Sequence, residues 1–173
     1  KYRKNDGSYD CIVPGSGGKD SGMASHILKY KYGMNPLTVT FSPLLYTDIG
    51  LKNMNNWLDK GGFDNILFKA NGKVSRLLAR EAFDNILHPL QPFKSGLKVF
   101  PIKMAIKYNV NLVFYGEARA EYGSENANKV DSPGFGEDFY SFKEDKAKSF
   151  ISGLPIDKIK DKYDLSDNDL EPY

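Results

Sequence analysis

The sequence predicts an α/β fold in which a parallel β-sheet has helices packed on both faces. Up to about residue 115, short β-rich segments alternate with longer segments of helical periodicity, which is the pattern of a parallel sheet. The β-rich segments are almost continuously apolar, as is typical of strands that are covered on both sides. A glycine-rich turn joins the first of them directly to a helical segment, and open α/β sheets bind ligands at such turns.

The predicted elements follow one another along the first two thirds of the chain. Strands are expected at residues 9–14, 37–41, 65–68 and 111–115, and helices at residues 21–32, 49–60, 73–87 and 101–108. The first helix has an apolar stripe that includes Met23 and Leu28, and we expect Gly33 to end it in the left-handed conformation. These elements form the main domain, which we assign to residues 1–138.

The remainder of the chain predicts a small, mostly helical C-terminal appendage, residues 139–173. Its patterns are short and charged, and they indicate two small helices at residues 156–163 and 166–171. Ser166 and Asp169 have the spacing of a helix start. Between the two parts, residues 118–139 are rich in glycine and polar side chains, and we expect this loop to close over a bound ligand.

Composition and charge argue against several classes of protein, and nucleic-acid binding is left unsupported but not excluded. The formal net charge of the 173 residues is +2, and lysines and acids are interspersed along the chain, so no charged face for nucleic acid is expected. Cys11 is the single cysteine and lies in an apolar run, which predicts a buried side chain and excludes an internal disulfide or CxxC pair. Without a long apolar segment or a signal-peptide pattern, we expect a cytoplasmic protein with no membrane contact.

The turn after the first predicted strand has the composition of a phosphate-binding loop. Glycines allow the backbone to approach a bulky anion, and the N–H groups at the start of the next helix face it. Lys19 adds a positive charge, and Ser16 and Ser21 add hydroxyl donors. A Walker loop is excluded because Val13 and Asp20 stand where that motif needs glycine and Ser or Thr, and Asp20 also breaks the dinucleotide fingerprint.

The run Ser16-Gly17-Gly18-Lys19-Asp20-Ser21 resembles the PP-loop of the ATP pyrophosphatases, whose pattern is Ser-Gly-Gly-any-Asp-Ser. The resemblance implies ATP and Mg²⁺ as cofactors and a Rossmann-like HUP fold (adenine nucleotide α-hydrolase-like), with residues 1–138 as the ATP-binding domain. It implies that Lys19, Asp20 and Ser21 are catalytic, while Ser16, Gly17, Gly18 and Ser21 hold the pyrophosphate. Asp20 would position Mg²⁺ or the loop, or alternatively cap the helix.

The same resemblance places the rest of the nucleotide site at the ends of two predicted strands. The base would lie against Val39, Thr40 and Phe41, although these residues fit plain strand packing equally well. Gly116 and Glu117 would line the same crevice from the end of the fourth strand.

Beyond the loop, the chain is similar to the N-acetyl sugar amidotransferases of bacterial surface-glycan biosynthesis, through residues 46–50, 61–65, 114–117 and 120–123. This similarity implies an enzyme that adenylates the amide oxygen of an N-acetyl sugar for replacement by ammonia, and a free or nucleotide-linked N-acetyl sugar as substrate. Because those proteins are longer at both ends, we expect this chain to be a core fragment, and both a monomer and an oligomer are compatible with it. The candidate substrate residues are Tyr46, Asp48, Glu117, Arg119, Glu121 and Tyr122, with a charged surface loop as the alternative for the last four.

Ammonia is expected to come from a separate glutaminase subunit, because a glutaminase needs a reactive cysteine with a histidine nearby. Cys11 is predicted to be buried, and the two histidines are His26 in the first helix and His88 before a proline. Two alternatives remain at this point: a tRNA- or RNA-modifying PP-loop ATPase, and a module that binds ATP without turning it over.

Overall fold

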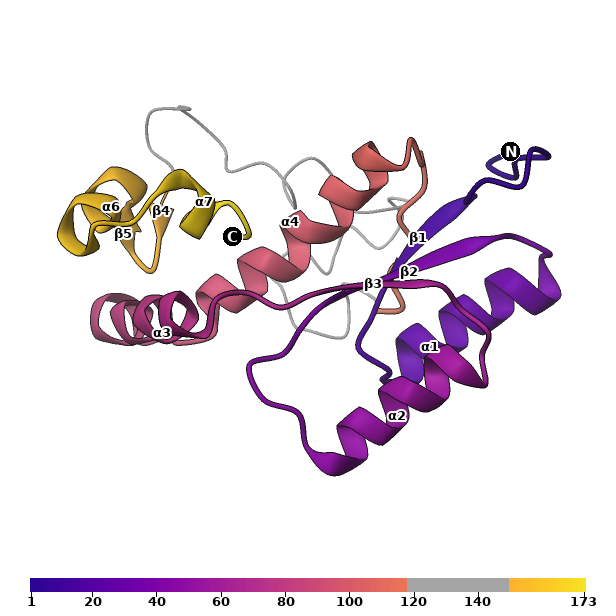
Figure 1. Ribbon diagram of the computed structural model, residues 1–173, viewed down its shortest axis with the longest axis horizontal. Coiled ribbons are helices and arrows are strands. Elements are labelled where there is room, and N and C mark those ends of the chain that lie inside the picture. The colour runs from indigo at the N-terminus through magenta and orange to yellow at the C-terminus, as the bar shows by residue number, and fades with distance from the viewer. Residues whose placement is uncertain (118–149) are drawn as a thin grey trace, which may run out of the picture. The chain divides into compact units, whose positions relative to one another are not determined.

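The computed structural model describes residues 1–117 and 150–173, which divide into two compact units (Figure 1). The first unit comprises residues 1–69 and 100–117. Of the described residues, the second unit comprises 70–99 and 150–173. The predicted domain boundary at residue 138 lies outside the described residues, but residues 70–99, which we expected in the main domain, group with the C-terminal segment. No helix in the described ranges is both long and apolar enough to cross a membrane.

The first unit contains a parallel three-stranded sheet, which confirms the mixed α/β class. Its strands are β1 (Cys11–Pro14), β2 (Pro36–Phe41) and β3 (Asn65–Phe68), in the order β1-β2-β3. Ile12 pairs with Leu37, and Val39 with Ile66. Helix α1 (Lys19–His26), extended by a π-helical turn at Ile27–Lys31, links β1 to β2, and helix α2 (Asp48–Asp59) links β2 to β3. Gly33 has a φ of 60°, the left-handed value that we predicted for the end of the first helix.

Both faces of this sheet are covered by helices. On one face, Cys11 and Val13 pack against Ala24 and Leu28 from the α1 segment. On the other face, the stacked rings of Phe41 and Phe68 lie 6.2 and 5.5 Å from the ring of Phe100 in helix α4 (Gln91–Lys107). In Figure 1, α1 and α2 lie together on one side of the sheet. Covering on both sides accounts for the mostly apolar sequences of β1 and β2, whereas Leu67 of β3 is 46% exposed.

The predicted fourth strand, residues 111–115, was wrong as a full strand. Only Val113 forms a bridge, in parallel with Ile12. The N–H of Ile12 donates to the oxygen of Leu112 and the N–H of Phe114 donates to the oxygen of Ile12, both at 2.8 Å. The ladder stops there because the chain bends at Gly116 toward the start of α1. β2 pairs with one edge of β1, and the segment at residues 111–115 lies at the other edge. The order of the strands in the sheet therefore still reverses direction at β1.

The predicted helix at residues 101–108 begins ten residues earlier, at Gln91 in α4. Proline is common in the first turn of a helix, where its missing N–H is not needed, and is rare in a helix interior. In the structure Pro92 occupies the first turn, and Pro101 is buried in the helix interior. The stretch that begins at His88 is therefore a short connection between helices.

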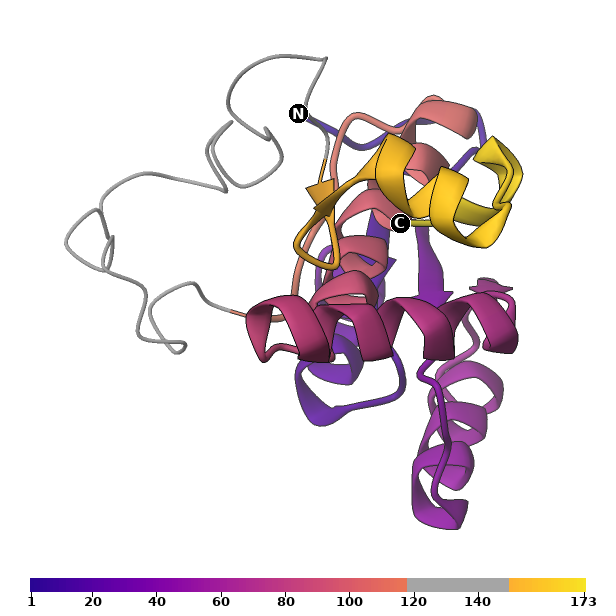
Figure 2. The same cartoon turned by 90° about the vertical axis from the view of Figure 1, so that its left-hand side faces the viewer.

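The second unit is built on helix α3 (Gly72–Ile86), which the sequence predicted to within one residue. A hairpin of β4 (Phe150–Ile151) and β5 (Leu154–Pro155) leads into α6 (Ile156–Tyr163) and α7 (Asp167–Leu170). Both views show the hairpin and α6 beside α3 (Figures 1 and 2). The hydrophobic core of this unit includes Val74, Leu78, Ile151, Ile159 and Leu170. The two small C-terminal helices are confirmed, including the Ser166–Asp169 capping box.

Candidate functional site

The glycine-rich loop leaves β1 at its carboxyl end and becomes the first turn of α1. The N–H of Gly15 donates to the oxygen of Val39 at 3.0 Å, which continues the pairing of β1 with β2. Gly18 is the N-cap of α1, and its oxygen accepts from the Gly22 N–H at 3.0 Å and from the Ser21 hydroxyl at 3.2 Å. The cap residue therefore has no side chain to cover the amide groups of the first turn, which are the groups that attract anions.

The fold requires a glycine at position 17 but not at the neighbouring position 18. Gly17 has a φ of 84°, and a Cβ there would lie 2.5 Å from the Cα of Met54 in α2, so the fold itself requires glycine. Gly18 has a φ of −71° and a ψ of 164°, which any residue adopts. No described atom would lie within 4 Å of a Cβ at Gly18. Open space lies next to the Gly18 backbone, at the start of the helix.

Gly116, at the end of the segment at residues 111–115, packs closely against this loop, although neither it nor Glu117 lines the pocket described below. A Cβ at Gly116 would lie 2.6 Å from the carbonyl carbon of Asp20 and 2.8 Å from the nitrogen of Ser21. Such a close approach is open only to glycine. The exposed Glu117 follows directly. The loop thus lies where the strand order reverses beside β1, which is the usual position of ligand sites in open α/β sheets.

Lys19 and Asp20 form an ion pair with each other, with 2.6 Å between Nζ and Oδ1. The Lys19 side chain is 90% exposed and that of Asp20 is 44% exposed. An exposed pair between neighbouring residues contributes little to stability, because water screens both charges. Both side chains can therefore turn toward a charged ligand at small cost.

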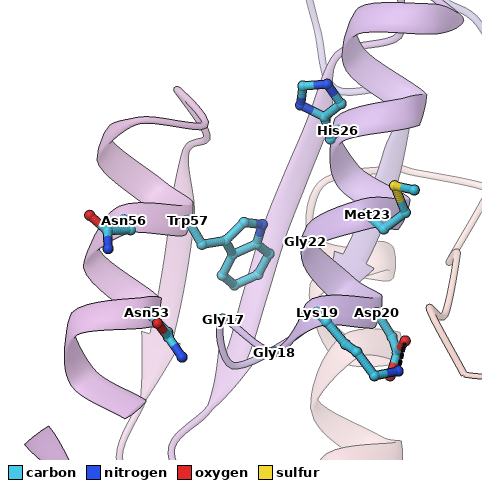
Figure 3. A pocket seen from close by; sticks show the side chains of 10 residues that line it. All are labelled: Gly17, Gly18, Lys19, Asp20, Gly22, Met23, His26, Asn53, Asn56 and Trp57. Atoms are coloured by element: carbon cyan, nitrogen blue, oxygen red, sulfur yellow. Dashed lines mark hydrogen bonds and ion pairs between the residues drawn. The ribbon is translucent and has the colours of Figure 1, made fainter. Parts of the chain in front are cut away.

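A pocket of about 780 Å³ opens beside the loop, between α1 and α2 (Figure 3). The loop and α1 line it with Gly17, Gly18, Lys19, Asp20, Gly22, Met23 and His26, and α2 lines it with Asn53, Asn56 and Trp57. The indole N–H of Trp57 donates to the hydroxyl of Ser25 at 2.8 Å, which joins α1 and α2. Four of our predicted residues, Gly17 to Asp20, are among the lining residues.

The α2 residues and the outer residues of α1 were missed by sequence reasoning. Positions 53, 56 and 57 share one face of a helix, and this spacing is visible in the sequence. The sequence alone does not predict which face of α2 packs against the loop. The close contact between Gly17 and Met54 settles that question in the structure.

Several predicted site residues lie elsewhere in the fold. The side chains of Val39, Thr40 and Phe41 are 1%, 0% and 5% exposed and do not line the pocket. The Thr40 hydroxyl donates to Oδ1 of Asn65 at 3.2 Å, so this side chain is used in strand packing. The hydroxyl of Tyr46 donates to the sulfur of Met54 at 3.3 Å.

Other predicted residues lie at the edge of the site or beyond the described ranges. Asp48 is exposed and is the first residue of α2, directly after the N-cap residue Thr47. Ser16 is exposed and Ser21 is half-buried, both within the loop. Arg119, Glu121, Tyr122 and the predicted closing loop at residues 118–139 lie outside the described residues.

The chemistry of the described side chains suits an anion and a hard cation. Within residues 1–117 and 150–173, no three His, Cys, Asp or Glu side chains gather as a metal site. Mg²⁺ is usually held by one or two carboxylates together with phosphate oxygens and water, and Asp20 supplies such a carboxylate. Cys11 is fully buried, and burial raises the pKa of its thiol to about 12. The predicted burial of this cysteine is confirmed, and its thiol is not available as a nucleophile.

The fold and the loop define a mixed α/β protein with a glycine-rich turn between its first strand and its first helix. The chain matches no protein-family model. No curated protein matches its sequence significantly.

Proposed function

We propose that this chain binds ATP at the loop formed by residues 16–21 and that it promotes attack on the α-phosphate, with release of pyrophosphate. The sequence of the loop resembles the PP-loop of ATP pyrophosphatases, and its position at the carboxyl end of β1 supports this assignment. The finer assignment to a Rossmann-like HUP fold belongs to the same proposal. The described sheet, with its reversal of order beside β1, is compatible with that fold.

The observation that carries the proposal is the open space next to Gly18. The fold places no steric demand on this residue, and its backbone angles suit any amino acid. A glycine at the cap of α1 is nevertheless useful if a bulky anion must approach the backbone amides. Lys19 then lies beside the anion, where it can neutralise charge that grows on a leaving pyrophosphate.

The proposed first step joins the amide oxygen of an N-acetyl group to the α-phosphorus of ATP. The bond from that phosphorus to the bridging oxygen breaks, and pyrophosphate leaves with the electron pair. The backbone amides of the loop and Lys19 stabilise the negative charge, and the step also requires that the attacking oxygen be held in line with the bond that breaks. Bound Mg²⁺ would neutralise phosphate charge, and Asp20 of the loop would be its protein ligand.

In the second step, ammonia adds to the carbon of the adenylated imidate, the carbon–oxygen bond to AMP breaks, and an acetamidino sugar remains. We propose a separate glutaminase subunit as the source of ammonia. The inaccessible Cys11 thiol supports this assignment, because a glutaminase reaction needs a reactive cysteine. The same inaccessibility counts against an RNA-thiolating enzyme that would carry sulfur on this cysteine.

Product analysis tests the proposed function. The protein is incubated with ATP, Mg²⁺, ammonium and a panel of free and nucleotide-linked acetamido sugars, and the phosphorus products are separated. We expect AMP and pyrophosphate, formed only with a suitable sugar. Formation of ADP and phosphate would contradict the proposed chemistry, and tight ATP binding without turnover would identify a nucleotide-binding module.

A further inference from the structure

Four segments of the first unit meet at the edge of the sheet where its parallel strands begin, opposite to the glycine-rich loop (Figure 1). We call this surface the amino edge, and its segments are residues 1–10, 29–35, 59–64 and 107–110. The first three directly precede β1, β2 and β3, and the last precedes the segment that bridges to β1 at Val113. The Tyr9 hydroxyl donates to Oδ2 of Asp64 at 2.9 Å, and the Tyr9 ring lies 5.9 Å from that of Tyr108.

The amino edge carries more positive charge than the chain as a whole. Its segments contain seven lysines and arginines against four aspartates, a formal charge of +3, whereas the full chain carries +2. The seven cations are Lys1, Arg3, Lys4, Lys29, Lys31, Lys60 and Lys107. Within residues 1–117 and 150–173, none of the seven forms an ion pair with a carboxylate. Folding therefore gathers cations that are interspersed with acids along the sequence.

Three of these cations are held in place by backbone carbonyl groups. They donate hydrogen bonds as follows: Arg3 to the oxygen of Tyr32, Lys4 to that of Asn109, and Lys29 to that of Gly62. Each of these oxygens lies just past the end of a helix, where a positive charge is favourable. A carbonyl oxygen fixes a cation without cancelling its full charge. The surface is therefore ordered in advance for an anionic partner.

Most aspartates of the amino edge are engaged by uncharged groups. Oδ1 of Asp6 accepts from the N–H and the hydroxyl of Ser8 at 2.9 and 2.6 Å. Asp10 is 3% exposed and accepts from a backbone N–H at 2.7 Å. Asp64 accepts from a tyrosine hydroxyl, and Asp59 is exposed. Only a minority of the acids at this edge is thus free to oppose a bound anion.

Tyrosines are concentrated at the same edge. Five of the 11 tyrosines of the chain lie in the four segments. Tyr30 and Tyr32 are 56% and 53% exposed. The ammonium of Lys29 lies 5.6 Å from the ring centroid of Tyr30, and that of Lys31 lies 5.9 Å from the ring centroid of Tyr32. An exposed ring beside an ammonium group offers a stacking surface for a base and a charge for its phosphate.

The composition of the amino edge favours nucleic acid over an acidic protein. Six of its seven cations are lysines, and lysine is depleted at protein interfaces but binds phosphate well. The exposed rings favour a single strand, because a duplex stacks its bases on one another and a single strand leaves their faces accessible.

We propose that the amino edge binds single-stranded nucleic acid without sequence preference, with phosphates at the lysines and a base stacked on Tyr32. This proposal goes beyond the ATP site, which lies at the carboxyl end of β1. It replaces our expectation that the chain has no charged face for nucleic acid, which was drawn from the order of charges along the sequence.

Fluorescence anisotropy with a labelled oligouridylate of about 12 nucleotides, a typical length for a single-strand site, measures binding to the whole chain. Oligodeoxythymidylate and a duplex of the same length, polyglutamate, phosphatidylserine vesicles and Mg-ATP serve as competitors. Tyr32→Leu removes the ring, and Tyr32→Phe is its matched control. Lys31→Gln removes one charge, and Lys158→Gln changes an exposed lysine of α6 as the control. Thermal unfolding by circular dichroism verifies that each variant keeps the fold.

We expect the oligouridylate to bind about tenfold more tightly than the duplex, and Tyr32→Leu to weaken its binding by about tenfold, the scale of one lost stacked base. Tyr32→Phe should bind as the wild type. Lys31→Gln should reduce the slope of log affinity against log salt concentration by about 0.7, and Lys158→Gln should leave it unchanged. Tighter binding of the oligodeoxythymidylate would support the proposal and identify DNA as the ligand.

Three results would overturn this proposal. Equal affinity for the duplex, or unchanged binding by Tyr32→Leu, would show that the rings take no part. Displacement by polyglutamate or by the vesicles at equal charge concentration would assign the surface to an acidic protein or a membrane. Displacement by Mg-ATP would place the oligonucleotide at the loop, whereas failure of the chain to bind ATP would refute the proposed function alone.

Discussion

The adjacent glycines Gly17 and Gly18 allow the demands of folding to be separated from those of ligand binding. In Gly17→Ala, a residue with a side chain must adopt a φ of 84°, which costs about 1–2 kcal/mol. Its Cβ would also lie 2.5 and 2.7 Å from the Cα and N of Met54, and relief of such overpacking costs about 1–3 kcal/mol. We therefore expect Gly17→Ala to destabilise the first unit by about 2–5 kcal/mol.

Gly18→Ala should change stability by less than about 1 kcal/mol. Loss of a glycine cap costs a few tenths to about 1 kcal/mol, and the reduced entropy of the unfolded chain returns about 0.4–1 kcal/mol. The new methyl group nevertheless lies in the space where the anion must approach. We expect ATP and pyrophosphate to bind at least about tenfold more weakly, which corresponds to about 1.4 kcal/mol.

Urea unfolding followed by Trp57 fluorescence measures the first effect, because this residue lies in the first unit. Calorimetric titration with Mg-ATP measures the second. Equal destabilisation by the two substitutions would refute the described loop geometry. Normal ATP binding by a stable Gly18→Ala variant would show that the space beside Gly18 is not used by the ligand.

Three further predictions concern individual side chains. Lys19→Ala should lower turnover by about 100-fold or more in a steady-state assay of pyrophosphate release, because the charge acts mainly in the transition state; near-normal turnover would remove Lys19 from the mechanism. Cys11 should resist alkylation at pH 8 in the native protein and react quickly in denaturant, since its thiol is buried and its pKa is raised to about 12; rapid native labelling would contradict the buried position. Hydrogen bonds from Tyr163 and Lys162 hold the pKa of Glu81 below its ordinary value, so Glu81 contributes stability above that ordinary pKa and the contribution is lost as the pH falls through the lowered pKa. Glu81→Gln should flatten the acid dependence of unfolding, and an unchanged acid profile would exclude this role.

The sequence predicted the three strands of the sheet because each is a nearly continuous apolar run, which is typical of strands in a covered parallel sheet. It predicted the glycine-rich loop because strand, turn and helix follow within a few residues. The segment at residues 111–115 has the same apolar character, yet only Val113 pairs with β1. The length of a strand also depends on the path of the residues that follow it. Here the chain bends at Gly116, which packs against Asp20 and Ser21, and hydrophobic periodicity does not predict such a tertiary contact.

The pocket and the β4–β5 hairpin were not predicted from the sequence, for two different reasons. Asn53, Asn56 and Trp57 lie more than 30 residues from the loop, and their approach depends on the packing of α2 against Gly17. The β4–β5 hairpin, in contrast, had a local signal. Its turn residues Ser152 and Gly153 both have positive φ, and a Ser-Gly pair between apolar residues is a known turn sequence.

The fate of the acceptor's oxygen tests the central claim, attack on the α-phosphate, most directly. An acetamido sugar that carries a heavy-oxygen label in its acetyl carbonyl is incubated with ATP, Mg²⁺, ammonium and the protein, and the products are analysed by mass spectrometry. If the amide oxygen attacks the α-phosphorus and the carbon–oxygen bond later breaks, the label must appear in AMP and not in pyrophosphate. Unlabelled AMP formed together with the amidino product would contradict the proposed chemistry.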